Sequence, residues 1–281
     1  MTNDEVRKYL LPPLFNAAVR AGDAIMQVYK QDTHYDIEIK DDKTPIILAD
    51  KLAHQTIREY LGPTRIPILS EEGREMLFDE RRNWELYWLV DPLDGTMEFI
   101  KQNNEFTVNI ALMHHKVCVL AVIYVPYYEK MYIASAGGGA YLKCGVKTSA
   151  EADYKYDEIL AECRSLPFAK EQGHSHLRVG VSRSHQTQET YDYIDRLKVD
   201  YPSLEVVEQG SSYKFCMLAE GVIDYYVRTT HTYEWDTAAG ELILKEAGGD
   251  TRALPSGERL LYNEEDLRNP WFECKSKYCP F

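Results

Sequence analysis

The most constraining feature of the sequence is the hexapeptide DPLDGT at Asp91–Thr96, which directly follows the apolar run Leu86–Val90. A short apolar run of this kind is typical of a buried strand. Both carboxylates are therefore expected at the C-terminal end of a strand. Pro92 fixes one φ angle, and Gly95 permits a turn that other residues resist. We expect the two carboxylates to face one point, with the hydroxyl of Thr96 beside them.

Clustered carboxylates repel one another unless a cation lies between them, and hard oxygen ligands of this kind favour Mg²⁺. The simpler alternative is a turn, because an Asp-Gly pair after a strand is common in turns. A calcium-binding EF-hand loop is excluded, since its acids alternate before the glycine. In this sequence Asp91 and Asp94 are three positions apart.

Three further acidic positions accompany the hexapeptide. Glu71-Glu72 follows the apolar run Ile66–Leu69, and Asp50 lies off the apolar stripe of a second predicted helix. Asp236 is placed where the N-cap of the last predicted helix is expected. Each has an ordinary alternative: a solvated turn, a surface acid and a helix cap. A helix N-terminus also attracts phosphate.

The chain is predicted to combine helices and strands in two halves. Helical periodicity covers Val6–Gln31 and Leu48–Leu61. Five strands are predicted next: Ile66–Leu69, Leu86–Val90, Phe106–Met113, Val117–Val125 and Met131–Ala134. Of these, Phe106–Met113 and Val117–Val125 are expected to form a hairpin. Elements then alternate, with strands at Ile159–Cys163, Leu177–Val181, Leu204–Val207 and Ile223–Arg228 and helices at Gln188–Leu197, Ser211–Ala219 and Trp235–Ala247. Alternation indicates a mixed α/β layer.

The polar, acid-rich segment Ser149–Glu158 is the best candidate for a boundary. We therefore divide the chain into an α+β half at 1–150, which carries the candidate metal ligands, and an α/β half at 151–281, which carries the substrate contacts. Both halves pack into one continuous unit. The sequence suggests no role for the C-terminal stretch Tyr262–Phe281.

Charge and hydropathy exclude several classes of function. The chain has 32 Lys and Arg against 45 Asp and Glu, a formal net charge of −13, which excludes a duplex nucleic-acid binder that works by bulk charge. The longest apolar run, Val117–Val125, is far shorter than the ~20 residues that span a bilayer. With no basic start before an apolar stretch, a cytoplasmic location and reduced cysteines are expected. Peripheral membrane association and the oligomeric state are left open.

Taken together, the motifs resemble the inositol monophosphatase superfamily of lithium-sensitive, Mg²⁺-dependent phosphatases. The resemblance runs from about Ala17 to Gly249 and depends on the order of these residues: Lys40, Asp50, Glu71-Glu72, the DPLDGT hexapeptide, Trp235-Asp236, Ala238-Ala239-Gly240 and Glu246–Gly249. It implies a layered αβαβα sandwich with the active site between the two halves.

Finer features resemble one branch, the 3'(2'),5'-bisphosphate nucleotidases of the CysQ type. They are Glu98-Phe99-Ile100, Ser182–His185 and Gly210–Cys216. The implied activity is hydrolysis of the 3'-phosphate of adenosine 3',5'-bisphosphate to AMP and phosphate by a metal-activated water. That nucleotide is a by-product of sulfate activation and transfer.

The resemblance also implies a role for each residue. Two or three Mg²⁺ ions, with Li⁺ as an inhibitor, are expected on these metal ligands: Glu71, Asp91, Asp94, Asp236 and the backbone carbonyl of Leu93. Thr96 is expected to activate water together with Asp50, with Glu71 or Glu72 as the alternative base. Substrate contacts are expected from these residues: Gly95, Thr96, His185, Ser211, Lys214 and Arg228.

Other interpretations remain open at this point. Lys214 could instead lie on a solvated helix face, and Arg228 could pair with a surface acid. His185 could be an ordinary turn residue. Met97 stands where the branch often has Lys, and Glu234 adds an anion near Asp236, so substrate preference and affinity are uncertain. The alternatives for the whole chain are an inositol monophosphatase or sugar bisphosphatase and, from another class, a non-catalytic regulator that binds metal or nucleotide.

Overall fold

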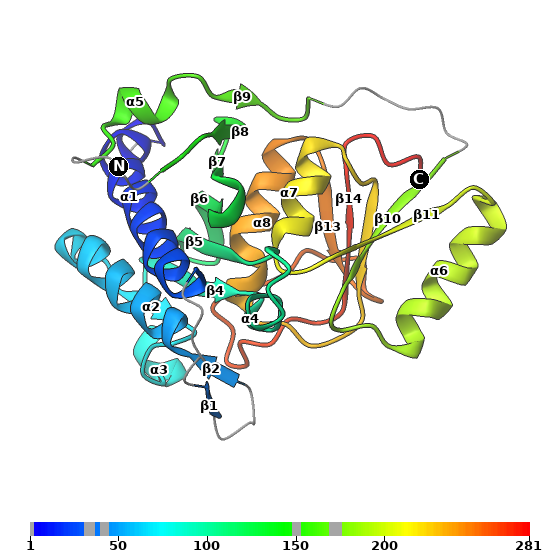
Figure 1. Cartoon of the computed structure of the whole chain (residues 1–281), viewed down its shortest axis with the longest axis horizontal. Coiled ribbons are helices and arrows are strands. Elements are labelled where there is room, and N and C mark those ends of the chain that lie inside the picture. The colour runs from blue at the N-terminus through cyan, green and yellow to red at the C-terminus, as the bar shows by residue number, and fades with distance from the viewer. Residues whose placement is uncertain (1–2, 31–36, 40–44, 148–152, 169–175) are drawn as a thin grey trace.

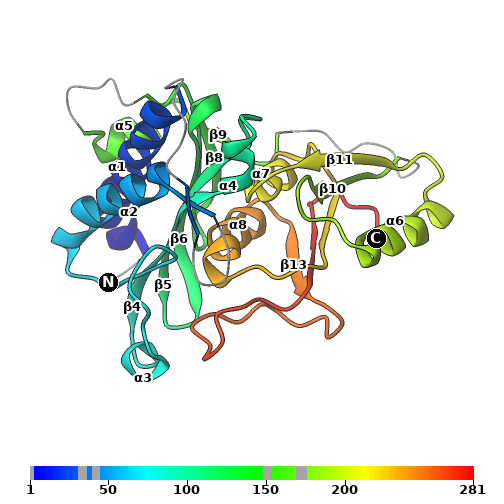
Figure 2. The ribbon, with the colours of Figure 1, turned by 60° about the horizontal axis from the view of Figure 1, so that its bottom comes forward.

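Five layers make up the protein, as Figure 2 shows. The computed structural model describes residues 3–30, 37–39, 45–147, 153–168 and 176–281. Helices α1 (Asn3–Tyr29) and α2 (Leu48–Leu61) cover one face of a seven-stranded sheet. Helices α7 (Tyr213–Glu220) and α8 (Glu234–Glu246) lie between this sheet and a five-stranded sheet, and α6 (Gln188–Asp200) packs beyond the second sheet. The expected αβαβα sandwich is confirmed.

The seven-stranded sheet is buried on both faces, which explains its long apolar runs. Its order is β3 (Ile68–Ser70), β4 (Leu86–Asp94), β5 (Thr107–His114), β6 (Val117–Val125), β7 (Lys130–Ser135), β8 (Gly139–Cys144) and β9 (Arg164–Ser165). Only the β3–β4 pair is parallel. Trp88 and Val90 face α1 and α2, whereas Tyr87 and Leu89 face α7 and α8. The predicted β5–β6 hairpin is confirmed.

The five-stranded sheet has the order β11 (Glu205–Gln209), β10 (Arg178–Ser182), β12 (Tyr225–Arg228), β14 (Phe272–Lys275) and β13 (Asp250–Ala253). The first three strands are parallel, and β14 is antiparallel to both of its neighbours. The C-terminal stretch, which had no predicted role, therefore supplies an interior strand. Its pattern FECK alternates apolar and charged residues too briefly to mark a strand in the sequence.

One predicted strand, Ile159–Cys163, is wrong. The structure forms helix α5 (Tyr156–Leu160) there. Within α5, Ile159 alone is buried, and the Glu158 carboxylate accepts the N–H of Lys155 at 2.8 Å. A single buried side chain and a side-chain bond at the first turn favour a helical turn over a strand.

The remaining elements are short. They are β1 (Ile37–Ile39) and β2 (Pro45–Ile47), which form an antiparallel pair (Figure 1), α3 (Phe78–Arg81), α4 (Thr96–Ile100) and the 3₁₀ turns η1 (Gly62–Thr64) and η2 (Pro126–Tyr128). Lys40, part of the family pattern, lies outside the described residues. The seven-stranded sheet extends to β9, past residue 151, and the division of the chain at 150 stays a prediction.

Within the described residues, no helix combines the length and apolar character needed to cross a bilayer. All six cysteines fall within these residues, and none is paired in a disulfide there.

Helices α7 and α8 approach closely because α8 carries a glycine at the contact. A Cβ atom at Gly240 would lie 2.4 Å from Cγ of Phe215 and 2.8 Å from its Cβ. Phe215 is buried and its ring packs against Tyr226 and Phe272. These near-backbone atoms have little room to move aside.

We predict that Gly240→Ala destabilises the protein by about 1–3 kcal/mol, because overpacking at this contact outweighs the ~1 kcal/mol that alanine adds to helix propensity. Urea unfolding measures the difference. Gly62→Ala is the matched control, because a Cβ there meets no atom within 4 Å. A Gly240→Ala protein as stable as the Gly62→Ala control would contradict the account of this contact.

Candidate active site

The geometry of the site begins with an irregularity in β4. Asp91 pairs with Asn109 of β5, and Asp94 pairs with Thr107, so three steps along β4 match two along β5. In a regular strand, residues three apart point to opposite faces. The extra residue of the β-bulge restores both carboxylates to one face. Leu93 accordingly packs into the core on the α1 and α2 side, and Asp91 and Asp94 face α8.

Two local features fix this bulge. The Asp91 carboxylate accepts the N–H of Leu93 at 3.0 Å, which closes the turn on itself. Gly95 then adopts φ +92°, a left-handed conformation that favours glycine. A Cβ there would also lie 3.2 Å from Cβ of Ser211 and 3.3 Å from the carbonyl oxygen of Glu105. The expectation of a special turn at Gly95 is confirmed, and α4 begins directly after it.

A buried hydrogen-bond network holds Asp94 from two sides. Its Oδ2 accepts the backbone N–H of Ser212, and the Asn109 amide lies 3.4 Å from the same oxygen. The Ser212 hydroxyl donates to Asn109 Oδ1 at 2.7 Å and lies 2.8 Å from the Thr107 hydroxyl. Sequence reasoning missed this network. The available signal was the pair of polar residues at alternate positions, Thr107 and Asn109, inside an apolar strand.

Asp236 reaches the site from the first turn of α8. The helix begins at Glu234, so Asp236 is its third residue and not its N-cap, which corrects the sequence-based expectation. Its carboxylate accepts the N–H of Tyr233, the N-cap residue, at 2.8 Å. An acid at the third position can reach back in this way. The N-terminal turn also favours a negative charge through the helix dipole.

Glu234 is turned to other partners. Its carboxylate accepts the N–H groups of Asn263 at 2.7 Å and Glu264 at 2.9 Å, and it does not line the cavity. The Glu234 carboxylate, expected as an anion beside Asp236, therefore binds the backbone of the segment after α8.

The remaining predicted acids occupy different surroundings. Glu71 lines the cavity, and its N–H donates to the carbonyl of Val90 at 3.1 Å, which continues the β3–β4 pairing. Asp50 is buried in α2 and acts electrostatically on Asp91 without lining the cavity. Glu72 does not line the cavity either. Its charge acts to raise the pKa of His54, which burial lowers.

We use the term acidic cluster for Glu71, Asp91, Asp94 and Asp236. Burial raises the pKa of Asp91, and repulsion from the other acids of the cluster raises it further. Burial likewise raises the pKa of Asp236, and repulsion from neighbouring acids raises it further. Burial also raises the pKa of Asp94. Oxygen donors held together against their repulsion match the donor set of a hard divalent cation. The residues present therefore fit such an ion.

Positive groups line the cavity beside the acids. Lys214 is 2% exposed and donates to the carbonyls of Gln209 at 2.8 Å and Ser211 at 2.6 Å, so the alternative of a solvated helix face is wrong. Burial lowers its pKa to about 8. Arg228 donates to the carbonyl of His231 at 3.4 Å, and its buried Nε has no hydrogen-bond partner among the described residues. The more exposed His185 lines the same cavity.

The three segments that distinguished one branch of the superfamily converge in space. The Glu98 carboxylate accepts a hydrogen bond from Ser184 at 2.6 Å. A Cβ at Gly210 would lie 2.3 Å from Cγ of Glu98, and Glu98 also acts electrostatically on Lys214. Glu98 is 3% exposed. Sequence reasoning used it only as a branch marker, whereas the structure places it in the cavity wall.

One cavity of about 230 Å³ brings these groups together. It includes every predicted metal and substrate residue: Glu71, Asp91, Leu93, Asp94, Asp236, Gly95, Thr96, His185, Ser211, Lys214 and Arg228. Met97, where the branch often has Lys, also lines it. The arrangement can hold a cation at its acidic side chains and an anion at its basic ones.

Comparison with known proteins gives the family. The model of the inositol monophosphatase family matches residues 7–271. The chain belongs to this family. It is 36% identical to the 3'(2'),5'-bisphosphate nucleotidase CysQ of Escherichia coli K12 over 266 residues, 94% of this chain and 98% of that protein. For the protein of the same name from Haemophilus influenzae the identity is 34%, over 95% and 93% of the two chains.

A solved structure agrees with this assignment. The crystal structure of CysQ from Bacteroides thetaiotaomicron superposes with a TM-score of 0.85 at 41% identity and covers 94% of this chain and 96% of that chain. An inositol monophosphatase from Anabaena shares the fold, with a TM-score of 0.71 at 21% identity. The CysQ-type resemblance and the expectation of an enzyme of the phosphatase class are confirmed.

We predict that Ser212→Ala lowers the free energy of unfolding by about 1–3 kcal/mol, because it leaves the buried Asn109 Oδ1 without its donor. Urea unfolding gives the value. The exposed Ser256→Ala serves as the control and should stay within about 0.5 kcal/mol of the wild type. Equal stability of the two variants would mean that the Ser212 hydroxyl does not stabilise this network.

Proposed function

We propose that the chain is a Mg²⁺-dependent phosphatase that removes the 3'-phosphate of adenosine 3',5'-bisphosphate and releases AMP and phosphate. The observation that carries the proposal is a single cavity lined both by the acidic cluster and by the basic side chains of Lys214, Arg228 and His185. Similarity to proteins named as bisphosphate nucleotidases over 94% of the chain supports the nucleotide as substrate. The reaction would clear a by-product of sulfate activation.

The proposed metal ligands are the acidic cluster and the backbone carbonyl of Leu93, all oxygen donors suited to Mg²⁺. No three of the four carboxylates, each within the described residues, bring oxygens within 4.8 Å of one another. Carboxylates this far apart favour two or more ions over one. Bound Mg²⁺ would offset the carboxylate repulsion, draw phosphate oxygens to the acidic cluster and lower the pKa of a water molecule.

Thr96 and Asp50 are the proposed residues that orient the attacking water. The Thr96 hydroxyl lies 3.5 Å from the carbonyl of Leu93, at the edge of hydrogen-bond distance, so it can turn toward a water. Asp50 contributes a buried negative charge next to Asp91. Neither Asp50 nor Glu72 lines the cavity, but the charge of Asp50 raises the pKa of Asp91, whereas that of Glu72 acts on His54, so Glu72 has weaker support as a base.

The phosphate is proposed to bind at the start of α4. Gly95 is the N-cap of this helix and Thr96 its first residue, positions where backbone N–H groups have no acceptor within the helix. Arg228, His185 and Ser211 would contact the second phosphate and the ribose. Lys214 holds the loop at Ser211 through its two carbonyl bonds and adds a positive charge.

Phosphate release tests the proposal directly. Metal-free protein is given Mg²⁺ and then adenosine 3',5'-bisphosphate, inositol 1-phosphate or fructose 1,6-bisphosphate, beside an Asp94→Asn control. We expect preference for the nucleotide, loss of release with a chelator or in Asp94→Asn, and inhibition by Li⁺. Preference for inositol or sugar phosphate would discard the branch and keep the metal site. Binding without release of any phosphate would support the non-catalytic alternative.

The stacked rings of Tyr233 and Trp235 give a second test of the substrate class. The ring of Tyr233 lines the cavity, is 37% exposed, and stacks on Trp235 at 4.9 Å with 9° between planes. An exposed, supported ring of this kind can stack a nucleobase, which contributes about 1–3 kcal/mol per base.

We predict that Tyr233→Ala raises KM for the nucleotide by about tenfold, within that stacking energy, and leaves KM for inositol 1-phosphate unchanged. Steady-state kinetics measure both constants. Tyr233→Phe keeps the ring and should behave like the wild type. An equal rise for both substrates would show that Tyr233 shapes the cavity without recognising a base.

A further inference from the structure

Two histidines and a glutamate meet at the end of the β4–β5 pair that lies away from the acidic cluster. Glu85 directly precedes β4, and His114 ends β5 opposite Leu86. His115 follows in the turn of the hairpin and donates its N–H to the carbonyl of Glu85 at 2.7 Å. Because six residues along β4 separate Glu85 from Asp91, the two groups are about 20 Å apart.

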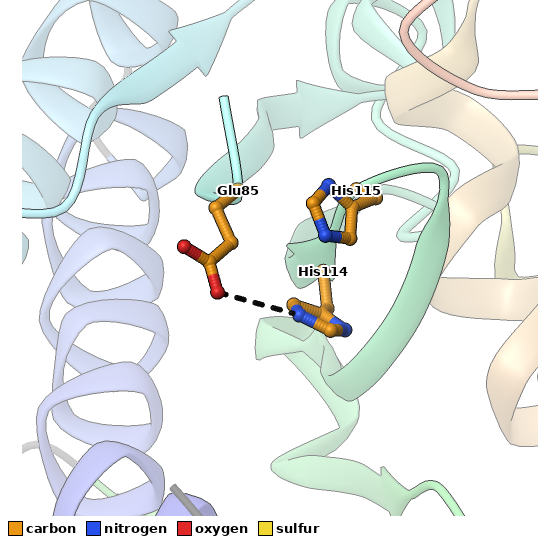
Figure 3. A group of neighbouring side chains, drawn as sticks. All are labelled: Glu85, His114 and His115. Carbon is orange, nitrogen blue, oxygen red and sulfur yellow. Dashed lines mark ion pairs between the residues drawn. The ribbon is translucent and has the colours of Figure 1, made fainter. Parts of the chain in front are cut away.

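The three side chains point toward one another (Figure 3), and their ligand atoms all lie within 4.8 Å of one another. Nε2 of His114 is 3.9 Å from a Glu85 carboxylate oxygen, and the two imidazole rings are 4.6 Å apart. Bonds of about 2.0–2.1 Å to a tetrahedral ion would place the ligand atoms roughly 3.4 Å apart. Side-chain rotation can close that gap because all three residues are exposed.

The backbone beneath these ligands is already fixed. The Glu85–His115 hydrogen bond joins the two chain segments, and the ladder pairs His114 with Leu86, the residue after Glu85. His115 has φ +52°, the conformation of the turn itself. The neighbouring cation, Lys116, pairs with Glu264, so its charge is engaged away from this trio. An ion would therefore require movement of side chains only.

The donor set indicates which ion fits. Two imidazoles and one carboxylate suit Zn²⁺ and its neighbours Ni²⁺ and Cu²⁺, whereas Mg²⁺ prefers oxygen alone. Three protein ligands leave a coordination position for water or for a group from another molecule. We propose that Glu85, His114 and His115 form a surface site for one transition-metal ion of the Zn²⁺ class, separate from the acidic cluster.

Calorimetric titration with Zn²⁺, in excess Mg²⁺ to occupy the acidic cluster, tests the proposal. His114→Gln removes one ligand. His115→Asn removes another with a residue that tolerates the same left-handed turn. Each variant should lose one Zn²⁺ equivalent or bind it at least about tenfold more weakly, since loss of even a supporting residue costs 10–100-fold. Mg²⁺-dependent phosphate release should stay unchanged, because no residue of the trio lines the cavity.

His176→Gln is the matched control. His176 is exposed and lies 3.3 Å from Glu205, so among the described residues it pairs one imidazole with one carboxylate without a second histidine. The control should bind Zn²⁺ as the wild type does. Wild-type stoichiometry and affinity in both His114→Gln and His115→Asn would overturn the proposal, as would an equal loss in His176→Gln. Neither result depends on the substrate of the enzyme.

Discussion

The site depends on the β-bulge between Asp91 and Asp94. A regular strand would have turned one of these carboxylates toward the core beneath α1 and α2, where an unpaired charge is costly. The bulge moves Leu93 to that core and both acids to the opposite face. Proline, which lacks an N–H, and a glycine at φ +92° make the irregularity possible at this point of the chain.

The middle helical layer lies between the two sheets and also contributes residues to the site. Ser212, directly before α7, binds Asp94, and the first turn of α8 presents Asp236. The closeness of α7 and α8 at Gly240 therefore bears on the spacing between Asp94, on the seven-stranded sheet, and Asp236, in α8. Packing in this layer therefore helps to set the geometry of the acidic cluster. The packing does not remove the repulsion between the carboxylates, which a bound cation would offset.

The sequence predicted most of the fold and most of the cavity lining, because periodicity and the DPLDGT hexapeptide are local signals. It could not predict β14, whose four residues have too short a pattern, or helix α5, where one buried Ile159 looks the same in a strand as in a helical turn. The register of Asp236 within α8 depended on where the helix starts, which Tyr233 and the segment near Asn263 decide. The contact of Glu98 with Ser184 joins residues 86 positions apart, which no local pattern reveals.

Anomalous diffraction from crystals grown with Mn²⁺ tests the central claim most directly, because Mn²⁺ accepts the same oxygen ligands as Mg²⁺ and its position can be seen. The account predicts anomalous peaks between the carboxylates of Asp91, Asp94 and Asp236, with the bulge unchanged. Crystals that hold Mn²⁺ elsewhere and leave these carboxylates without a peak would contradict it.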